Sequence, residues 1–156
     1  MELGKAVQAT LEMLKHNIEE KRLTVKTEDE HAPPLLCQPD KILQVIYNIV
    51  LNAVHVSTPD SKLSIRIKAD SECAILEVQD FGEGMTQATR NRVFEPFFTT
   101  KPVGQGTGLG MAVSYGIVID HGGMIAIESE LHRGTTVQVR LPFNPPQRQN
   151  GQNATS

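Results

Sequence analysis

The stretch from Ile42 to Ala53 is apolar on nearly all sides, and it constrains the fold more than any other part of the chain. Its aliphatic residues recur at helical spacing, which predicts a helix from Asp40 to Ser57 that is buried over most of its surface. One polar stripe remains on this helix, and its spacing of i, i+4, i+8 and i+11 points it in a single direction: Gln44, Asn48, Asn52 and His55. Buried amides of this kind need hydrogen-bonding or metal partners.

Two interpretations of the polar stripe remain open at this point. The side chains could satisfy the backbone of a neighbouring loop, as most buried polar groups do. Alternatively, an asparagine carbonyl oxygen could bind Mg²⁺, which takes few protein oxygens when waters and phosphates supply the rest of its ligands.

The remainder of the chain alternates between helical and strand patterns. The fold class expected from this order is α+β, a two-layer α/β sandwich in which a mixed, mostly antiparallel sheet is covered by three helices on one face. A proline- and glycine-rich stretch cannot hold regular structure and predicts a flexible loop over residues 95–107. We expect helices at 2–22, 40–57, 86–93 and 108–120, and strands at 23–27, 63–68, 76–79, 124–128 and 135–141.

Composition limits the class of protein. The chain has 156 residues, of which 39% are hydrophobic, and this suits one globular domain over residues 1–143 with a disordered tail over 144–156. A net charge of -3 with scattered Lys and Arg argues against nucleic-acid binding. No stretch suits a membrane span, so a cytoplasmic domain without direct membrane contact is expected. Cys37 and Cys73 are isolated, which predicts two buried free thiols.

Asp80 ends a predicted strand on the same face as Leu76 and Val78, so an apolar face finishes in a carboxylate. A hydrogen-bond acceptor beside an apolar pocket suits an adenine amino group, and Thr135 on the last strand could reach the same pocket. The commoner role of Asp before a glycine turn is to cap that turn, and Thr135 alone could be an ordinary strand residue.

A glycine-rich run from Gly104 to Gly110 leads directly into a predicted helix. Free backbone N–H groups and the positive end of the helix dipole then meet at one place, which predicts a phosphate site. The run is not a P-loop, because no Lys-Ser/Thr pair follows it. Lys101 adds a point charge there, although alone it would read as a solvated loop lysine. Beside it, three of the chain's five phenylalanines either pack the loop base or form a docking surface: Phe94, Phe97 and Phe98.

These blocks, in this order, resemble the catalytic and ATP-binding domain of bacterial sensor histidine kinases. This domain belongs to the Bergerat-fold superfamily shared with gyrase, the ninety-kilodalton heat-shock chaperone and mismatch-repair ATPases. Residues 48–53 look like the N box, 80–84 the G1 box, 94–98 the F box, 106–110 the G2 box and 134–135 the final Gly-Thr element. The run ending at Lys101 is similar to the nitrogen-regulator-like subgroup.

The resemblance implies that Asp80 binds adenine, that Asn52 binds Mg²⁺ and that Asn48 assists Mg²⁺ or phosphate. Lys101 would meet the γ-phosphate, and with the two asparagines it makes up the implied catalytic set. The implied cofactors are ATP and Mg²⁺. The full implied ATP-binding set is Asn48, Asn52, His55, Asp80, Gly82, Gly84, Met85, Phe94, Thr100, Lys101, Gly106, Thr107, Gly108, Leu109, Gly110 and Thr135.

Two features found in relatives of the family are absent from this sequence, a catalytic glutamate and an acceptor-histidine box. In the hydrolysing relatives a Glu one helical turn before the Mg²⁺-binding Asn activates water, whereas this chain has Asn48 there. No acceptor-histidine box is present, and His16, His31 and His132 read as surface residues. We therefore expect a monomer that transfers the γ-phosphoryl group to a histidine on a separate dimerisation domain, and that serves a response regulator indirectly.

Two alternative functions remain. The first is an anti-sigma-factor-like serine kinase of the same superfamily, against which stand Asn48 and the phenylalanine-rich box at 94–98. The second is a degenerate nucleotide-binding scaffold, against which stand the intact Asp80, Asn52 and glycine blocks.

Overall fold

The computed structural model describes residues 1–95 and 110–146, and these form one mixed sheet with helices packed on it. The sheet has 5 strands in the order β1-β2-β3-β5-β4. β1 runs parallel to β2, and all other pairs are antiparallel, as expected for this fold class. The elements are α1 (Leu3–Met13), α2 (Lys15–Glu20), β1 (Thr24–Asp29), α3 (Pro39–Val56), β2 (Lys62–Ala69), β3 (Cys73–Asp80), α4 (Gln87–Arg92), α5 (Gly110–Asp120), β4 (Met124–Glu130) and β5 (Gly134–Pro142).

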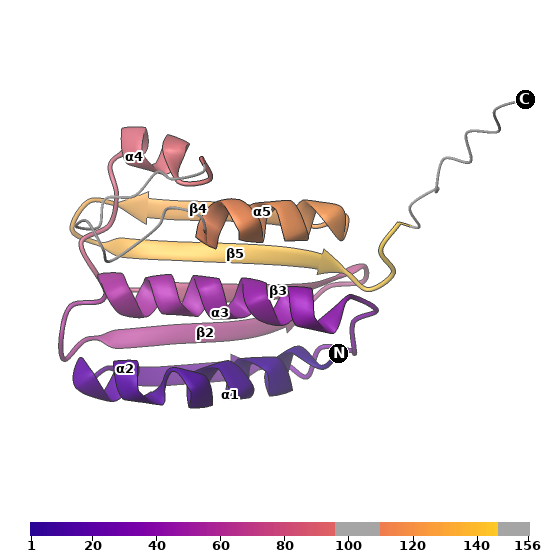
Figure 1. The fold of residues 1–156 in the computed structure, drawn as a ribbon, viewed down its shortest axis with the longest axis horizontal. Helices are drawn as coiled ribbons and strands as arrows, with labels where there is room; N and C mark the ends of the chain where they lie inside the picture. The colour runs from indigo at the N-terminus through magenta and orange to yellow at the C-terminus, as the bar shows by residue number, and fades with distance from the viewer. Residues whose placement is uncertain (96–109, 147–156) are drawn as a thin grey trace, which may run out of the picture.

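The helices form a single layer over one face of the sheet (Figure 1). α1 with α2, α3 and α5 lie side by side in front of the strands, while the short α4 lies beyond the β4 edge. This confirms the expected two-layer sandwich with helices on one face. The predicted flexible loop over 95–107 and the tail beyond residue 146 lie outside the described residues, except for Glu95.

α3 is the central helix of this layer and is buried on the sides that the sequence predicts. Pro39 occupies its first turn and Asp40 adds a negative charge there, and both favour a helix start. The apolar sides pack against the sheet and the neighbouring helices through the buried residues Ile42, Val45, Ile46, Ile49, Val50, Ala53 and Val54.

Lys21 holds the C-terminal end of α3. Its Nζ donates hydrogen bonds to the carbonyl oxygens of Val54 at 2.9 Å, His55 at 2.5 Å and Ser57 at 3.0 Å. These are the carbonyl groups that a helix end leaves without intrahelical partners. One side chain therefore ties the end of α2 to the end of α3.

We expect Lys21→Met to lower the free energy of unfolding by about 1–2 kcal/mol, because the methionine keeps the aliphatic stem but leaves three carbonyls without their cationic donor. Urea unfolding followed by circular dichroism measures this. The matched control is Lys15→Met, which removes only a contact of 4.0 Å to Glu19 and should cost less than about 0.5 kcal/mol. Equal losses in the two variants would contradict the capping role.

The first helical segment differs from the single helix predicted over 2–22. It divides into α1 and α2 at Leu14, whose φ and ψ of -99° and 7° depart from helical values. Backbone bonds from Leu14 to Thr10 and from Ile18 to Leu14 nevertheless continue the chain direction. The buried Thr10 hydroxyl donates to the Ala6 carbonyl at 2.9 Å, and such back-bonding bends helices.

The two faces of the sheet have opposite character. Inward residues such as Leu63, Ile65 and Val78 are buried under the helices. On the outer face, Glu77 accepts hydrogen bonds from Gln138 at 2.9 Å and Lys68 at 3.5 Å. Burial raises the pKa of Glu77, but these bonds outweigh it and leave the pKa below its ordinary value. The open face is thus covered by cross-strand polar pairs.

The two cysteines are less buried than the sequence predicts. Cys37 and Cys73 are free thiols, but both are partly exposed rather than buried, because they lie at the ends of the core instead of on its inward faces. Among the described helices, none is long and apolar enough to cross a bilayer.

Candidate nucleotide site

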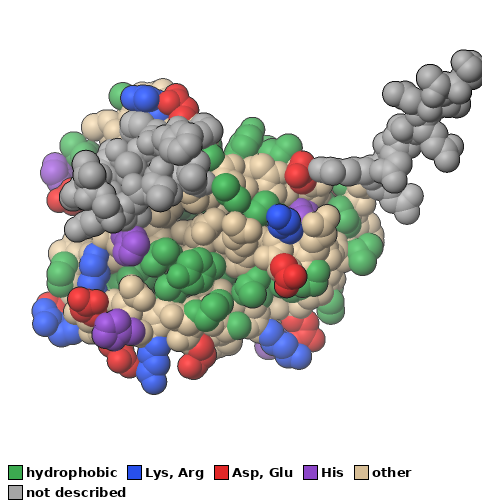
Figure 2. Space-filling model, in the orientation of Figure 1, with side chains coloured by type: hydrophobic (Ala, Val, Ile, Leu, Met, Phe, Trp, Pro, Cys, Tyr) green, Lys and Arg blue, Asp and Glu red, His purple; other side chains and the backbone are tan. Residues whose placement is uncertain are grey.

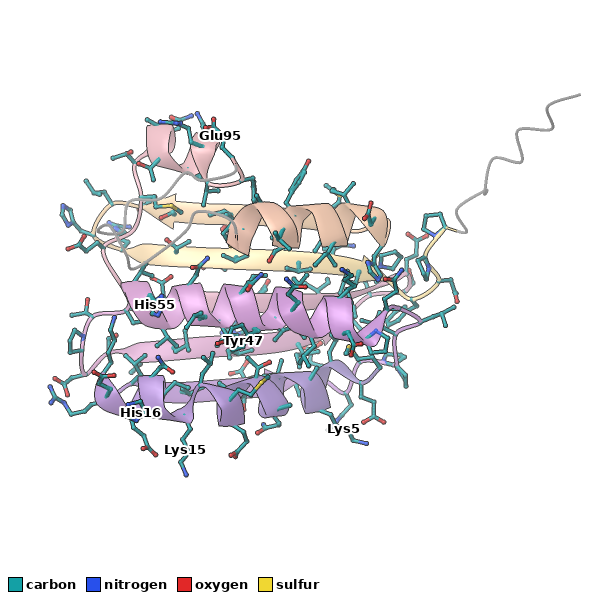
Figure 3. All side chains as sticks on the ribbon, viewed as in Figure 1. Lys5, Lys15, His16, Tyr47, His55 and Glu95 are labelled. Atoms are coloured by element: carbon teal, nitrogen blue, oxygen red, sulfur yellow. The ribbon has the colours of Figure 1, made fainter. Side chains whose placement is uncertain are left out.

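The polar stripe of α3 lies along one side of the candidate site. Asn48 and Asn52 are half-buried on successive turns, and His55 is exposed at the C-terminal end of the helix (Figure 3). The Asn48 amide nitrogen donates to the Gly110 carbonyl at 3.2 Å and to the Ser114 hydroxyl at 3.3 Å. The interpretation of local backbone satisfaction therefore holds for the nitrogen of Asn48, while no described residue donates to its carbonyl oxygen.

Asp80 is buried, with 4% of its surface exposed, at the end of β3. Its Oδ1 accepts from the backbone N–H of Gly82 at 3.0 Å and of Thr135 at 3.3 Å. Burial raises the pKa of Asp80, and backbone hydrogen bonds from Gly82, Thr135 and Asp80 itself oppose that rise without cancelling it. The turn-capping role is thus real but occupies one oxygen, and no described residue donates to Oδ2.

The glycines after Asp80 let the loop approach α3 and β4 closely. A Cβ on Gly82 would overlap the Val56 carbonyl oxygen at the end of α3. Gly84 has φ of 70°, and a Cβ there would overlap the Glu130 carbonyl oxygen. These close approaches bring the end of β3 against the C-terminal end of α3, so Asp80 and the polar stripe border the same region.

Thr135 lies directly opposite Asp80 in the β3–β5 register, as its inward face predicted. Its hydroxyl is 2.8 Å from the Ser129 hydroxyl, with either group able to donate. Ser129 also accepts from the Met85 backbone N–H at 2.8 Å. One serine therefore joins the glycine turn, β4 and Thr135.

The sequence reading missed two residues of this region, Ser114 and Ser129. Each is a polar residue on an otherwise apolar inward face: Ser129 shares one face of β4 with Ile125 and Ile127, and Ser114 lies one turn after Gly110 on α5. The same signal identified Asp80, so it was available for both serines.

α5 begins at Gly110, and its first backbone N–H groups have no partners within the helix. The Gly110 carbonyl receives the Asn48 amide, so the helix start lies beside the middle of α3. The remaining predicted loop residues lie outside the described residues: Phe97, Phe98, Thr100, Lys101, Gly106, Thr107, Gly108 and Leu109.

Phe94 is half-buried and contacts Tyr115 of α5, with ring centroids 5.0 Å apart and planes at 36°. This places the described part of the phenylalanine-rich box against the outside of α5. The contact agrees with the packing interpretation of that box, while its docking role and an ATP contact of Phe94 stay predictions.

The parts of the site are spaced along α3. Asn48, beside the start of α5, lies eight positions before Val56, beside the glycine turn, which corresponds to about 12 Å along the helix. Two open clefts of about 500 and 560 Å³ lie elsewhere, the first near the start of α1 and the second near the start of α3. Neither is lined by Asn48, Asn52 or Asp80.

A family model described as histidine kinase-, DNA gyrase B- and HSP90-like ATPase matches residues 37–145. The chain belongs to this family. The matched range contains α3, the end of β3, the start of α5 and Thr135, which are the parts of the candidate site. This confirms the resemblance inferred from the sequence motifs.

Curated relatives of the ATPase domain are sensor kinases. Sporulation kinase E of Bacillus subtilis is 40% identical over 124 residues, which cover 78% of this chain and 16% of the relative. Sporulation kinase D of the same organism is 44% identical, covering 71% of this chain and 22% of the relative. The sensor histidine kinase ZraS of Escherichia coli is 29% identical, covering 92% and 31%. The chain thus spans about a sixth to a third of these relatives.

Solved structures share the fold of this ATPase domain. The catalytic domain of histidine kinase ThkA has a TM-score of 0.83 and 25% identity, covering 92% of this chain and 93% of that one. Full-length ShkA in complex with AMPPNP also has a TM-score of 0.83, at 22% identity, covering 94% of this chain and 31% of that one. The α+β sandwich is therefore the fold of histidine kinase catalytic domains. The roles of individual residues remain predictions.

Proposed function

We propose that this domain binds Mg-ATP between α3, the end of β3 and the start of α5, and donates the γ-phosphoryl group to a histidine on a separate dimerisation domain in two-component signalling. The observation that carries the proposal is the buried carboxylate of Asp80. Backbone groups hold its Oδ1, while its Oδ2 is left for a ligand donor.

The adenine end of the proposed site has one strong acceptor in apolar surroundings. The carboxylate of Asp80 is buried, and no residue in the described part of the chain forms an ion pair with it, so burial of its charge is costly unless a ligand supplies hydrogen bonds. An adenine amino group offers such a donor, and the close packing of Gly82 on Val56 leaves backbone rather than side chains along the base. Thr135, opposite Asp80, is placed to contribute a hydroxyl.

The phosphate end of the proposed site combines a helix start with amide oxygens. The N–H groups of the first turn of α5, which have no partner within the helix, favour phosphate. Asn52 and the oxygen of Asn48, to which no residue in the described part of the chain donates, fit Mg²⁺, which prefers oxygen ligands and keeps several waters. The described residues contain no cluster of three or more His, Cys, Asp or Glu side chains that could hold a metal by itself. Gly106 to Leu109 and Lys101 are proposed to complete the phosphate site.

Transfer rather than hydrolysis follows from the side chain at position 48. A carboxylate there could accept a proton from water, whereas the amide of Asn48 cannot act as a general base at neutral pH. Bound ATP would therefore persist until an imidazole nucleophile approaches the γ-phosphate.

The outer face of α5 supports a separate protein partner. The helix is apolar all round, and Val113, Tyr115 and Ile119 are 39%, 43% and 46% exposed. Figure 2 shows hydrophobic side chains gathered over the middle and upper helices, while charged groups lie mainly around the edges of this face. An exposed apolar helix face beside the nucleotide is suited to dock the helices that carry the acceptor histidine.

The proposal is tested by calorimetric titration of the domain with ATP in the presence of Mg²⁺, followed long enough to detect heat from hydrolysis. We expect saturable binding with negligible turnover. Sustained turnover would instead place the domain with the hydrolysing members of the family, and an absence of binding would favour a degenerate scaffold.

The serine-kinase alternative is separated by the chemistry of the product. A longer chain that carries this domain, incubated with radiolabelled ATP, should form an acid-labile and base-stable phosphoprotein if histidine is the acceptor. An acid-stable label would favour serine.

A further inference from the structure

Ser114 is the buried polar residue of α5 in an otherwise apolar part of the helix. Its exposed fraction is 0%, and its neighbours Met111, Ile117 and Val118 on the inward side are also buried. Its hydroxyl accepts a hydrogen bond of 3.3 Å from the Asn48 amide nitrogen, which comes from a different helix. The hydroxyl thus lies in the α3–α5 interface, directly behind a proposed ligand of the nucleotide site.

The partners of Asn48 determine which way its amide faces. An asparagine amide has two N–H donors on the nitrogen and an acceptor on the oxygen. The Gly110 carbonyl can only accept, so the nitrogen rather than the oxygen must face it, at 3.2 Å. Ser114 takes the second proton. Both donors are then used within the interface, and Oδ1 is the polar atom of Asn48 that remains.

We propose that Ser114 is a positioning residue for Mg-ATP, because it binds the second amide proton of Asn48 and so presents Oδ1 alone to the ligand. Oδ1 can contact Mg²⁺ or accept from a metal-bound water, but it cannot donate to a phosphate oxygen. Asn48 therefore serves the metal side of the complex rather than the phosphate side. The inference rests on the proposed function of the domain and refines it.

The alternative is that Ser114 only fills the space between two helices. A space-filling serine would affect stability and would affect ATP binding to the same extent with or without metal. A positioning serine affects the part of the affinity that depends on Mg²⁺. The two roles are therefore separated by measuring ATP affinity under both conditions.

The experiment is calorimetric titration of the wild type and Ser114→Ala with ATP, once with saturating Mg²⁺ and once with EDTA. We expect Ser114→Ala to keep the wild-type ATP affinity in EDTA. The factor by which Mg²⁺ increases that affinity should fall about tenfold, as for loss of one well-placed hydrogen bond. Ser114→Cys keeps a weak acceptor of similar size, so its Mg²⁺-dependent gain in ATP affinity should lie between those of the wild type and Ser114→Ala. This variant supplies the comparison if the alanine variant does not fold.

The matched control is Thr10→Val, which also removes one hydroxyl at 0% exposure on a helix, distant from α5. It should leave the Mg²⁺-dependent gain unchanged. If the Ser114 variants bind ATP with the full gain from Mg²⁺, or lose affinity equally in both conditions, the positioning role is wrong while the proposed function stands. If the wild type itself binds no Mg-ATP, the proposed function fails and this inference fails with it.

Discussion

Replacing Asp80 with asparagine is expected to reduce ATP affinity by at least about 100-fold while leaving the fold intact. The reason is that a hydrogen bond to a charged acceptor is lost and two hydrogen-bond donors then face each other. The asparagine oxygen can still accept from Gly82 and Thr135, which keeps the turn. Its NH₂ group would occupy the position of Oδ2 and face the adenine amino group with another donor. Calorimetric titration of the variant with Mg-ATP measures the loss.

Asp80→Asn should also change how the stability of the domain depends on pH. Burial raises the pKa of Asp80 in the folded domain above the ordinary value of 3.8, so the folded state holds this proton more tightly than the unfolded chain. Its favourable contribution to stability is present below pH 3.8 and is lost as the pH rises through the folded pKa. The ATP-free Asp80→Asn domain should therefore be at least as stable as the wild type at pH 7, and it should lack this part of the pH dependence.

Asp29→Asn is the matched control for Asp80→Asn. Asp29 also ends a strand and accepts a backbone bond from the residue two positions later, His31, at 2.7 Å, but it is exposed. It should leave ATP affinity unchanged and alter the free energy of unfolding by less than about 0.5 kcal/mol. Unaltered ATP affinity in Asp80→Asn would refute the assignment of adenine to this carboxylate.

Replacing Gly84 with alanine is expected to destabilise the domain by at least about 3 kcal/mol, because two penalties combine. The φ of 70° is unfavourable for a residue with a Cβ, and that Cβ would overlap the backbone oxygen of Glu130. The backbone of β4 cannot yield as a flexible side chain would. Relief of the overlap would also pull Met85 away from Ser129, so ATP binding should weaken. Urea unfolding measures the change in stability.

Gly116→Ala provides the opposite control for the glycine experiment. Gly116 is exposed within α5, and a Cβ there would meet nothing within 4 Å. The substitution should stabilise the domain by about 0.5–1 kcal/mol through helix propensity. A loss below about 1 kcal/mol for Gly84→Ala would show that the turn accommodates a side chain, contrary to the close approach in the structure.

α5 shows where the local pattern is insufficient. Its apolar residues surround the helix, a pattern that indicates burial on all sides. In the described structure the side of Val113 and Tyr115 is nevertheless exposed. A sequence pattern reports which surfaces are apolar, but not whether another element of the same chain covers them.

The split of the first helix and the two missed serines have a related explanation. Leu14 continues the helical pattern, so its spacing does not signal the break after Met13. Ser114 and Ser129 matter because of their partners on other elements, Asn48 and Thr135. A polar residue on an apolar face marks each serine as unusual, but spacing along one element does not reveal a partner on another element.

The sequence by itself determined the helices and strands apart from the division of the first helix, the buried central helix, the polar stripe of Asn48 and Asn52, and the carboxylate at the end of an apolar strand face. These follow from periods of 3.6 and 2 residues and from glycine spacing, which are local properties of the chain. Only the tertiary structure decided the strand order, the pairing of Asp80 with Thr135, and the oxygen that each polar side chain leaves for a ligand. The physical reason is that a hydrogen bond between distant segments depends on how the layers pack, and packing is a property of the whole fold.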